Sequence, residues 1–343
     1  MLVQISIKNF KTFKEEAILS LVASNYTKEH AEENVFYATS SKIPLLKSAV
    51  IYGANASGKS KLIEAIVFFK DFIKKSSKES QAAEPIRIAS HRLNTTTENA
   101  PSLFEFIFVE NNELYRYGFE VDQTKVHAEW LYHKPKTKEV EIFYREAQEF
   151  ELHSTRFRIG KKLVGDQMIR ENALLLSVAA QFNDPLAIHI LEWLNHFNII
   201  SGIQEEGYEE LTVKQLDDPT KKDKILKFIQ FADLGIEDLM LKEIDVADLP
   251  KDFPNDLKEL LLKKQFTEIF SGIRTLHRKY DEKNLPLREM ESFSMSQDES
   301  SGTQKYFALS GIILDALESG GMLVIDELDA KLHPILVHNI VAL

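Results

Sequence analysis

The 343-residue chain contains no cysteine, which excludes disulfide bonds and zinc sites built from thiolates. No stretch approaches the ~20 uninterrupted apolar residues that a membrane-spanning helix needs. Residues 1–10 alternate apolar and polar side chains and lack the continuous apolar core of a signal peptide. The net charge of −11 argues against a surface coated for nucleic acid, although a local basic groove is compatible with it. These absences predict a cytoplasmic protein without a membrane segment.

The composition, with 44% hydrophobic and 28% charged residues, is typical of a globular protein with a sizeable core. The length predicts two domains, or one large domain with an insertion. Residues 48–52 form a short β-branched run that predicts a buried strand ending at Gly53. From Gly58 to Ile73 the apolar residues recur at helical spacing. The chain therefore predicts a strand, a glycine loop and a helix in succession.

Farther along, residues 103–154 alternate apolar and polar side chains, which predicts an antiparallel meander. Residues 172–181 are apolar and fit either a helix or a strand. The charged segment 205–287 predicts a mostly helical second lobe. A helix is expected over 302–319, followed by a buried strand over 322–325.

The glycine loop matches the phosphate-binding loop pattern. Glycines let successive backbone N–H groups point at one anion, and the following helix presents its positive end to it. A lysine and a serine at the end of such a loop supply a charge for the phosphates and a hydroxyl for magnesium. The alternative is a glycine turn before an ordinary helix. The pattern comprises Gly53, Ala54, Asn55, Ala56, Ser57, Gly58, Lys59 and Ser60.

An acidic pair follows the second predicted strand. Asp326 and Glu327 would emerge at its carboxyl end, where open α/β sheets bind their ligands. Asp326 is a candidate metal partner, and Glu327 is a candidate base for an attacking water. The alternative is that both acids only end a strand and cap the next helix.

A third pattern, residues 298–305, opens the helix that precedes this strand. Ser300 or Ser301 would cap the helix, and Gln304 lies at capping-box distance from Ser301. The functional alternative is that this helix start faces a phosphate. The sequence does not decide between the two.

The order of these motifs resembles that of an ABC-type ATPase head, as in the SMC, RecF and OLD relatives. Residues 5–13 resemble the N-terminal strand of that class, and residues 53–66 resemble its phosphate loop closely. Residues 300–303 resemble the degenerate signature of this branch. Residues 326–334 resemble the version in which Leu-His-Pro follows the acids.

The resemblance is strongest to stand-alone ATPases of abortive-infection and other phage-defence systems, a likeness shared by residues 116–119 and 129–131. It implies an α/β P-loop NTPase fold with a mixed sheet, an antiparallel meander and a helical second lobe. The nucleotide-binding lobe would comprise residues 1–203 and 300–343, and the helical lobe residues 204–299.

The resemblance also implies a site. ATP and Mg²⁺ would be bound by the phosphate loop, with Ser60, Asp326 and Gln181 as metal partners. Lys59 and Glu327 would act in catalysis. Ser300 and Gly302 would reach the γ-phosphate held by a second subunit, so that two heads dimerise around ATP. For Gln181 the alternative is a surface glutamine at a strand end.

The chain departs from the resembling class at several positions. His333 stands where SMC relatives carry a dimer-facing aspartate, and Ser301 replaces the first signature glycine. Relatives continue into a further strand with a switch histidine, for which His338 comes too early. Either the sequence is a fragment or the site is incomplete, so nucleotide binding is the firmer expectation and turnover the weaker one.

The expected function is an ATPase whose head dimerisation gates a partner effector, such as a nuclease or toxin in phage defence. The alternatives are an ATP-dependent sensor with little turnover, a DNA-associated repair ATPase, and a P-loop kinase. The helix start before the acidic pair argues against the kinase.

Two weaker candidates stay open. His127, Glu129 and His133 share a strand face, for which an ordinary strand is favoured over a metal site. Basic doublets favour a solvated face over a nucleic-acid contact, and they lie at residues 221–222, 263–264 and 278–279.

Overall fold

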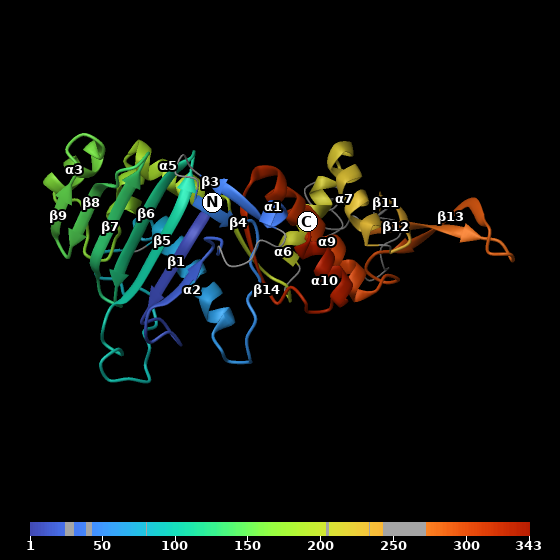
Figure 1. Cartoon of the computed structure of the whole chain (residues 1–343), viewed down its shortest axis with the longest axis horizontal. Helices are drawn as coiled ribbons and strands as arrows, with labels where there is room; N and C mark the ends of the chain where they lie inside the picture. Colours follow the sequence, from blue (N-terminus) through green and yellow to red (C-terminus); the bar gives the residue numbers. More distant parts are fainter. Residues whose placement is uncertain (25–30, 39–42, 80, 204–205, 233, 243–271) are drawn as a thin grey trace, which may run out of the picture. The chain divides into compact units, whose positions relative to one another are not determined.

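The computed structural model describes residues 1–24, 31–38, 43–79, 81–203, 206–232, 234–242 and 272–343 (Figure 1). The chain divides into two compact units, Met1–Ile199 and Ile200–Leu343. Each unit is described separately below.

The first unit is built on a seven-stranded antiparallel sheet with the strand order β2-β1-β5-β6-β7-β8-β9. The strands are β1 (Leu2–Lys8), β2 (Ala17–Ser20), β5 (Ser102–Glu110), β6 (Glu113–Val121), β7 (Val126–Lys134), β8 (Val140–Glu146) and β9 (Glu149–Leu152). Strands β5 to β9 follow one another as a meander, which confirms the antiparallel series predicted over 103–154.

The remaining elements of this unit are mostly helical. They are α1 (Ala31–Asn34), the hairpin β3 (Val35–Ala38) and β4 (Ile43–Leu46), α2 (Lys59–Lys75), α3 (Arg158–Gly165), α4 (Leu175–Gln181) and α5 (Pro185–Asn195).

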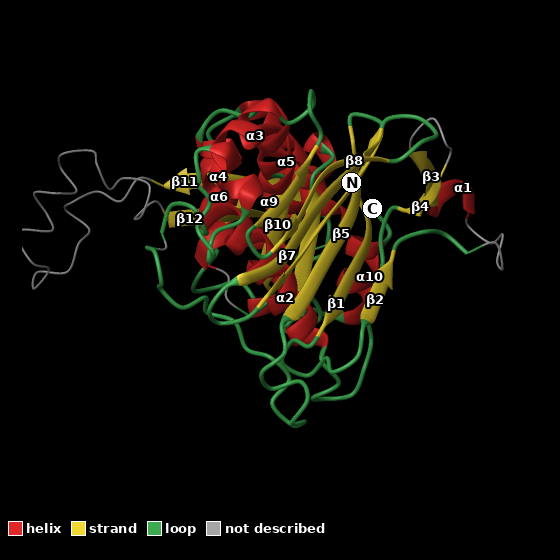
Figure 2. Cartoon of the chain, turned by 90° about the vertical axis from the view of Figure 1, so that its left-hand side faces the viewer, coloured by secondary structure: helices red, strands yellow, loops and turns green. Residues whose placement is uncertain are grey.

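Figure 2 shows the strands of this sheet with α2 and α5 beside them, and alternating phenylalanines on β5 make the contact with these helices. Phe106 stacks on Phe69 of α2, with ring centroids 3.6 Å apart. Phe108 stacks on Trp193 of α5 at 3.8 Å. Because side chains alternate along a strand, both phenylalanines project from the same face of β5. Helices α2 and α5 therefore cover one face of the sheet, and the glycine loop lies where α2 begins.

A buried ion pair joins the meander to α4. Glu129 on β7 and Arg145 on β8 are both fully buried, with Oε2 and Nη1 3.6 Å apart. Glu129 accepts hydrogen bonds from the backbone N–H groups of Leu175 and Leu176, at 2.6 and 3.0 Å. It also accepts one from the hydroxyl of Tyr117 at 2.9 Å. The carboxylate thus satisfies N–H groups at the start of α4, which would otherwise lack partners.

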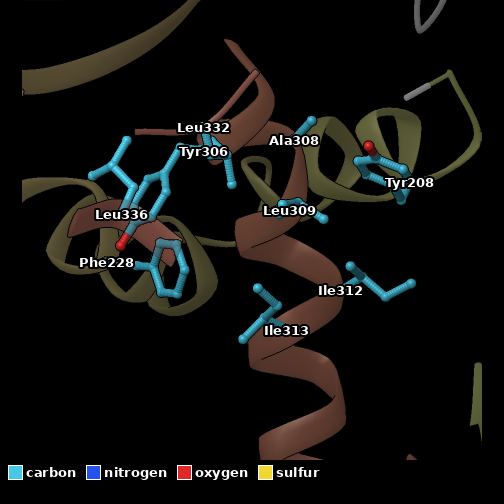
Figure 3. Packing of buried hydrophobic residues seen from close by; sticks show 9 residues of the cluster. All are labelled: Tyr208, Phe228, Tyr306, Ala308, Leu309, Ile312, Ile313, Leu332 and Leu336. Carbon is cyan, nitrogen blue, oxygen red and sulfur yellow. The ribbon is translucent and has the colours of Figure 1, made fainter. Parts of the chain in front are cut away.

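The second unit is organised around one long buried helix, α9 (Ser301–Ser319). The apolar residues that pack together on and around this helix are drawn in Figure 3. The other elements are α6 (Glu206–Gln215), α7 (Pro219–Phe231), β11 (Ile236–Lys242), β12 (Gly272–Tyr280), β13 (Pro286–Ser294), β14 (Met322–Asp326) and α10 (Pro334–Val341). Strand β14 pairs with β10 (Phe197–Ser201), the strand in which this unit begins. The helix over 302–319 and the strand over 322–325 are therefore confirmed, although β14 is only half-buried.

The prediction of a mostly helical second lobe is confirmed for residues 206–231, which form α6 and α7, and is wrong for the described residues that follow. After α6 and α7 the chain forms a three-stranded antiparallel sheet, β11-β12-β13. The charged side chains that suggested a helix lie on exposed faces of these strands, where Arg278 pairs with Glu237 and Lys279 with Glu291. Cross-strand ion pairs of this kind let a charged sequence form a sheet. Residues 243–271, including the doublet 263–264, lie outside the described residues.

The buried strand predicted over 48–52 is also wrong. Residues 48–52 form no strand, and the side chains of Val50, Ile51 and Tyr52 are 52%, 46% and 88% exposed. A β-branched run becomes a strand only where a neighbouring strand accepts its backbone hydrogen bonds. None of the described strands pairs with this run.

Residues 172–181 were predicted to form either a helix or a strand, and they form helix α4 from Leu175 onward. The predicted nucleotide-binding lobe joins residues 1–203 with residues 300–343. The two compact units of the structure divide the chain differently, because residues 300–343 belong to the unit that begins at Ile200. A nucleotide-binding lobe made from both ends of the chain stays a prediction.

Candidate functional site

The glycine loop of the first unit has the backbone of an anion-binding turn. Ala56 and Gly58 adopt left-handed backbone conformations, with φ of 64° and 103°. The φ value of Gly58 strains any other residue, and a Cβ there would also lie close to Thr12 Oγ1, at 3.2 Å. Ser57 N donates to Ala54 O at 3.1 Å and closes the turn. Gly53, Asn55 and Ser57 are exposed.

Helix α2 begins directly after this loop without a side-chain cap. The first N–H groups of a helix have no partner within the helix, and together with the helix dipole they favour an anion. The Lys59 ammonium donates to Gly53 O at 2.6 Å and to Ala54 O at 3.0 Å, so it lies across the loop. The Ser60 hydroxyl is exposed beside it. Backbone N–H groups, an ammonium and a hydroxyl are the donor set that a phosphate requires.

A charge cluster flanks the loop. Glu64, one turn into α2, accepts hydrogen bonds from Lys11 and from Lys61. Burial opposes ionisation of this carboxyl, but the two lysines outweigh burial and lower the pKa of Glu64. Lys11 comes from the turn after β1, the turn that also brings Thr12 to Gly58. The residues that resemble the family's N-terminal strand therefore lie beside the phosphate loop.

The acidic pair of the second unit lies on a strained turn after β14. Asp326, the last residue of the strand, is half-buried, and Glu327 is exposed with φ 54°. The amide of Gly202 donates to Asp326 O at 2.6 Å. A Cβ at Gly202 would lie 2.3 Å from Glu327 O, so no other residue fits without a shift of the turn.

A buried lysine contacts the same turn. Lys305 on α9 is fully buried, and its ammonium donates to Glu327 O, Leu328 O and Ala330 O at 3.2, 2.9 and 2.5 Å. Sequence reasoning assigned no role to Lys305 or Gly202. The signal that could have indicated a buried Lys305 was its position next to the apolar residues of the helix predicted over 302–319.

The start of α9 has the geometry of an ordinary N-cap, and its residues Ser300 and Ser301 are exposed. Ser300 is the N-cap and accepts a hydrogen bond from Thr303 N at 3.1 Å. The capping box from Ser301 to Gln304 is wrong, because Gln304 donates to Glu299 O instead. A Cβ at Gly302 would lie 3.0 Å from Lys331 O, which places this helix start against the acidic turn.

Comparison with known protein families gives a match that covers most of the chain. Residues 48–343 match the AAA_21 family, described as "AAA domain, putative AbiEii toxin, Type IV TA system". The chain belongs to this family. The match contains the phosphate loop, the start of α9 and the acidic pair, and membership implies a nucleotide-binding AAA domain. A search of the curated proteins finds no match.

For this AAA_21 member, the donors fit a nucleotide with magnesium better than a metal held by protein alone. Among the described residues no cluster of His, Cys, Asp or Glu could hold a metal ion. Magnesium usually takes one or two protein ligands and completes its shell with phosphate oxygens and water. The exposed Ser60 hydroxyl beside the glycine loop is a ligand of the kind that this mode uses.

The remaining candidates have structural partners. Glu129 is the buried partner of Arg145, His127 pairs with Asp122 at 2.7 Å, and His133 pairs with Glu113 at 2.7 Å. The favoured reading of an ordinary strand face is therefore confirmed.

Gln181 is exposed, as its alternative role as a surface glutamine predicted, but it ends helix α4 rather than a strand. Its role as a metal partner stays a prediction. His333 caps α10, and its Nδ1 accepts from Ile335 N at 3.3 Å. No described helix is long and apolar enough to span a membrane.

Proposed function

We propose that the chain binds ATP at residues 53–60 and hydrolyses it. The observation that carries the proposal is the loop itself, which combines left-handed turns at Ala56 and Gly58, a helix start without a side-chain cap, and Lys59 lying across the loop. This arrangement favours a polyphosphate, because several N–H groups and one ammonium can meet one anion.

The proposed roles follow the chemistry of each side chain. Lys59 binds the β and γ oxygens, and the loop amides from Gly53 to Ser60 bind the phosphate chain. Ser60 and Asp326 would hold Mg²⁺, and Gln181 would be a further contact. The metal supplies charge neutralisation at the phosphate oxygens when it is bound.

Glu327 accepts a proton from the attacking water. Its carboxylate is exposed, so it is accessible to a water and a nucleotide. Loss of this group would slow the chemical step while leaving the phosphate loop unchanged.

We further propose that hydrolysis is coupled to association of two heads. Ser300 and Gly302 lie at the start of α9, where an anion is favoured by the helix dipole. In the proposed assembly this helix start meets the γ-phosphate bound by the other subunit. Head association would then control a partner, for which the toxin–antitoxin description of the family suggests an antitoxin or an effector protein.

The test compares ATP binding, turnover and association in purified protein. Glu327→Gln should bind ATP as the wild type does and hydrolyse it roughly 10²-fold more slowly, as expected for loss of a general base. Sedimentation of Glu327→Gln with ATP and Mg²⁺ should reveal a dimer that is absent without nucleotide. Adding Ser300→Arg should abolish that dimer and leave ATP binding by single heads unchanged.

Each outcome decides one part of the proposal. Native turnover by Glu327→Gln would contradict the base assignment. ATP binding by a wild type that neither turns over nor dimerises would favour the sensor alternative. A dimer that persists without ATP and with Ser300→Arg would place the interface elsewhere and leave Ser300 as a helix cap.

A further inference from the structure

The buried ammonium of Lys305 contacts the turn that carries Glu327, and the proposed hydrolysis assigns it no role. Its side chain comes from the second turn of α9, five residues after the N-cap Ser300, and is fully buried. It donates to the carbonyl oxygens of Glu327, Leu328 and Ala330. A buried charge is retained only where hydrogen bonds replace water, and these carbonyl oxygens supply them.

The backbone that Lys305 holds is otherwise unfavourable. Glu327 and Lys331 have φ of 54° and 62°, a conformation that costs free energy for residues other than glycine. Such residues persist only where their surroundings fix them. The internal hydrogen bonds of the turn are Ala330 N to Glu327 O at 3.1 Å and Leu332 N to Asp329 O at 3.2 Å.

Two glycines hold the same turn from other sides. The end of β10 approaches at Gly202, whose amide bonds Asp326 O. The first turn of α9 approaches at Gly302, next to Lys331 O. The turn 326–331 is thus held between β10 and α9, and Lys305 donates most of the side-chain hydrogen bonds described for it.

We propose that Lys305 is a positioning residue for hydrolysis. It fixes the turn that aims the Glu327 carboxylate, and it ties this turn to the helix start at Ser300 and Gly302. A displacement of the start of α9 is therefore transmitted to Glu327 through one side chain. This inference rests on the proposed role of Glu327 as the base, and it adds the group that couples the base to α9.

The test is Lys305→Met, which keeps the length of the side chain and removes its donors. The expected result is a kcat reduced roughly 10- to 100-fold, the size that follows from misplacing a catalytic group. The dissociation constant for ATP should change less than about 2-fold, because the phosphate loop is untouched. Lys305→Arg should restore most of kcat, since a guanidinium also offers several N–H donors.

Two further variants separate positioning from folding. Ile313→Ala, which removes a buried apolar side chain two turns farther along α9, should lower the melting temperature and leave kcat near the wild-type value. Gly202→Ala, which disturbs the same turn from β10, should lower kcat as Lys305→Met does. In a Glu327→Gln background, Lys305→Met should change the residual rate less than about 2-fold, because the group that it positions is gone.

Hydrogen exchange of the amides in residues 327–332 gives a readout that does not require turnover. These amides should exchange faster in Lys305→Met than in the wild type, and their exchange rates should be unchanged in Ile313→Ala. Faster exchange with a native kcat would overturn the positioning role alone. A wild type that binds ATP without turnover would overturn the proposed hydrolysis, and the positioning role with it. Equal losses of kcat in Lys305→Met and Ile313→Ala would reduce Lys305 to a stability role.

Discussion

Lys59 and Lys305 make the same kind of contact in opposite surroundings. Both ammonium groups donate to backbone carbonyl oxygens of a turn. Lys59 is partly exposed at the mouth of an open loop, whereas Lys305 is fully buried. An exposed lysine can exchange carbonyl partners for a phosphate at little cost, since water satisfies the carbonyls it leaves. A buried lysine cannot move away without leaving these carbonyl oxygens buried and without a hydrogen-bond donor. The hydrogen bonds are similar, and exposure separates a cation that can exchange its partners for a ligand from one that cannot.

Arg145 provides the most severe test of this distinction. It is fully buried, and its guanidinium donates to Ala147 O, Ala173 O and Arg170 O as well as facing Glu129. Arg145→Met should lower the free energy of unfolding by about 3–5 kcal/mol, because Glu129 is left buried without its counter-charge. Urea denaturation measures this loss. Arg145→Met with Glu129→Leu should recover part of it, and a single variant within 0.5 kcal/mol of wild type, about the error of such comparisons, would contradict the distinction.

Lys59→Ala should have the reverse effect, with a large loss of binding and little loss of stability. ATP affinity should fall by at least ~10²-fold, about 2.7 kcal/mol, because the phosphates lose their main counter-charge. The melting temperature should stay close to wild type, since the side chain is partly exposed. Calorimetry measures the affinity. Lys61→Ala is the matched control, because Lys61 is the next cation on α2 and pairs with Glu64. Unchanged affinity of Lys59→Ala would refute ATP binding at this loop.

The two helix starts extend the comparison, since α2 begins without a side-chain cap and α9 is capped by Ser300. Ser300→Ala should cost about 1 kcal/mol of stability, the usual value for an N-cap, and leave ATP binding by single heads unchanged. Ser300→Thr should retain most of the stability. Denaturation followed by circular dichroism would check both variants, and no loss of stability in Ser300→Ala would contradict the capping role of Ser300.

The smallest effect is expected from a half-buried carboxylate. Burial opposes ionisation of Asp122, but hydrogen bonds from Thr124, His127 and the backbone outweigh it and hold the pKa well below the usual 3.8. A depressed pKa stabilises the folded state above about pH 4, and this contribution is lost as the pH falls further. Asp122→Asn should therefore cost ~0.5 kcal/mol at pH 7, and the difference from wild type should shrink from pH 4 to pH 2. Urea titrations across this range test the sign, and a difference that grows in acid would contradict it.

The parts of the fold that sequence predicted correctly are those whose signal is local. The alternating Phe104, Phe106 and Phe108 specify a strand and its buried face, and the apolar spacing after Gly58 specifies α2. The glycine loop before α2 was also predictable, because Gly53, Gly58 and Lys59 lie within one short stretch of sequence. Residues 48–52 carry an equally clear strand signal, yet a strand also requires a partner, which no local pattern supplies.

The groups that sequence missed are linked to distant backbone. Lys305 contacts carbonyl oxygens more than twenty residues away, and Gly202 meets a turn more than a hundred residues later. A backbone carbonyl is the same in every residue, so no side-chain pattern announces such a contact. The charged strands β12 and β13 were missed for a related reason, since their ion pairs are cross-strand rather than helical neighbours.

The placement of the tryptophans gives the first unit an optical signature of its own. The chain has two, and both belong to the first unit, where Trp130 lies on β7 and Trp193 stacks on Phe108 from α5. Intrinsic tryptophan emission therefore reports the melting of Met1–Ile199 and is silent on Ile200–Leu343. A difference between the emission transition and the circular-dichroism transition would reveal two cooperative units, and coincident transitions would reveal one. A tryptophan at the exposed Phe231 would extend the same spectroscopy to the second unit without disturbing its core.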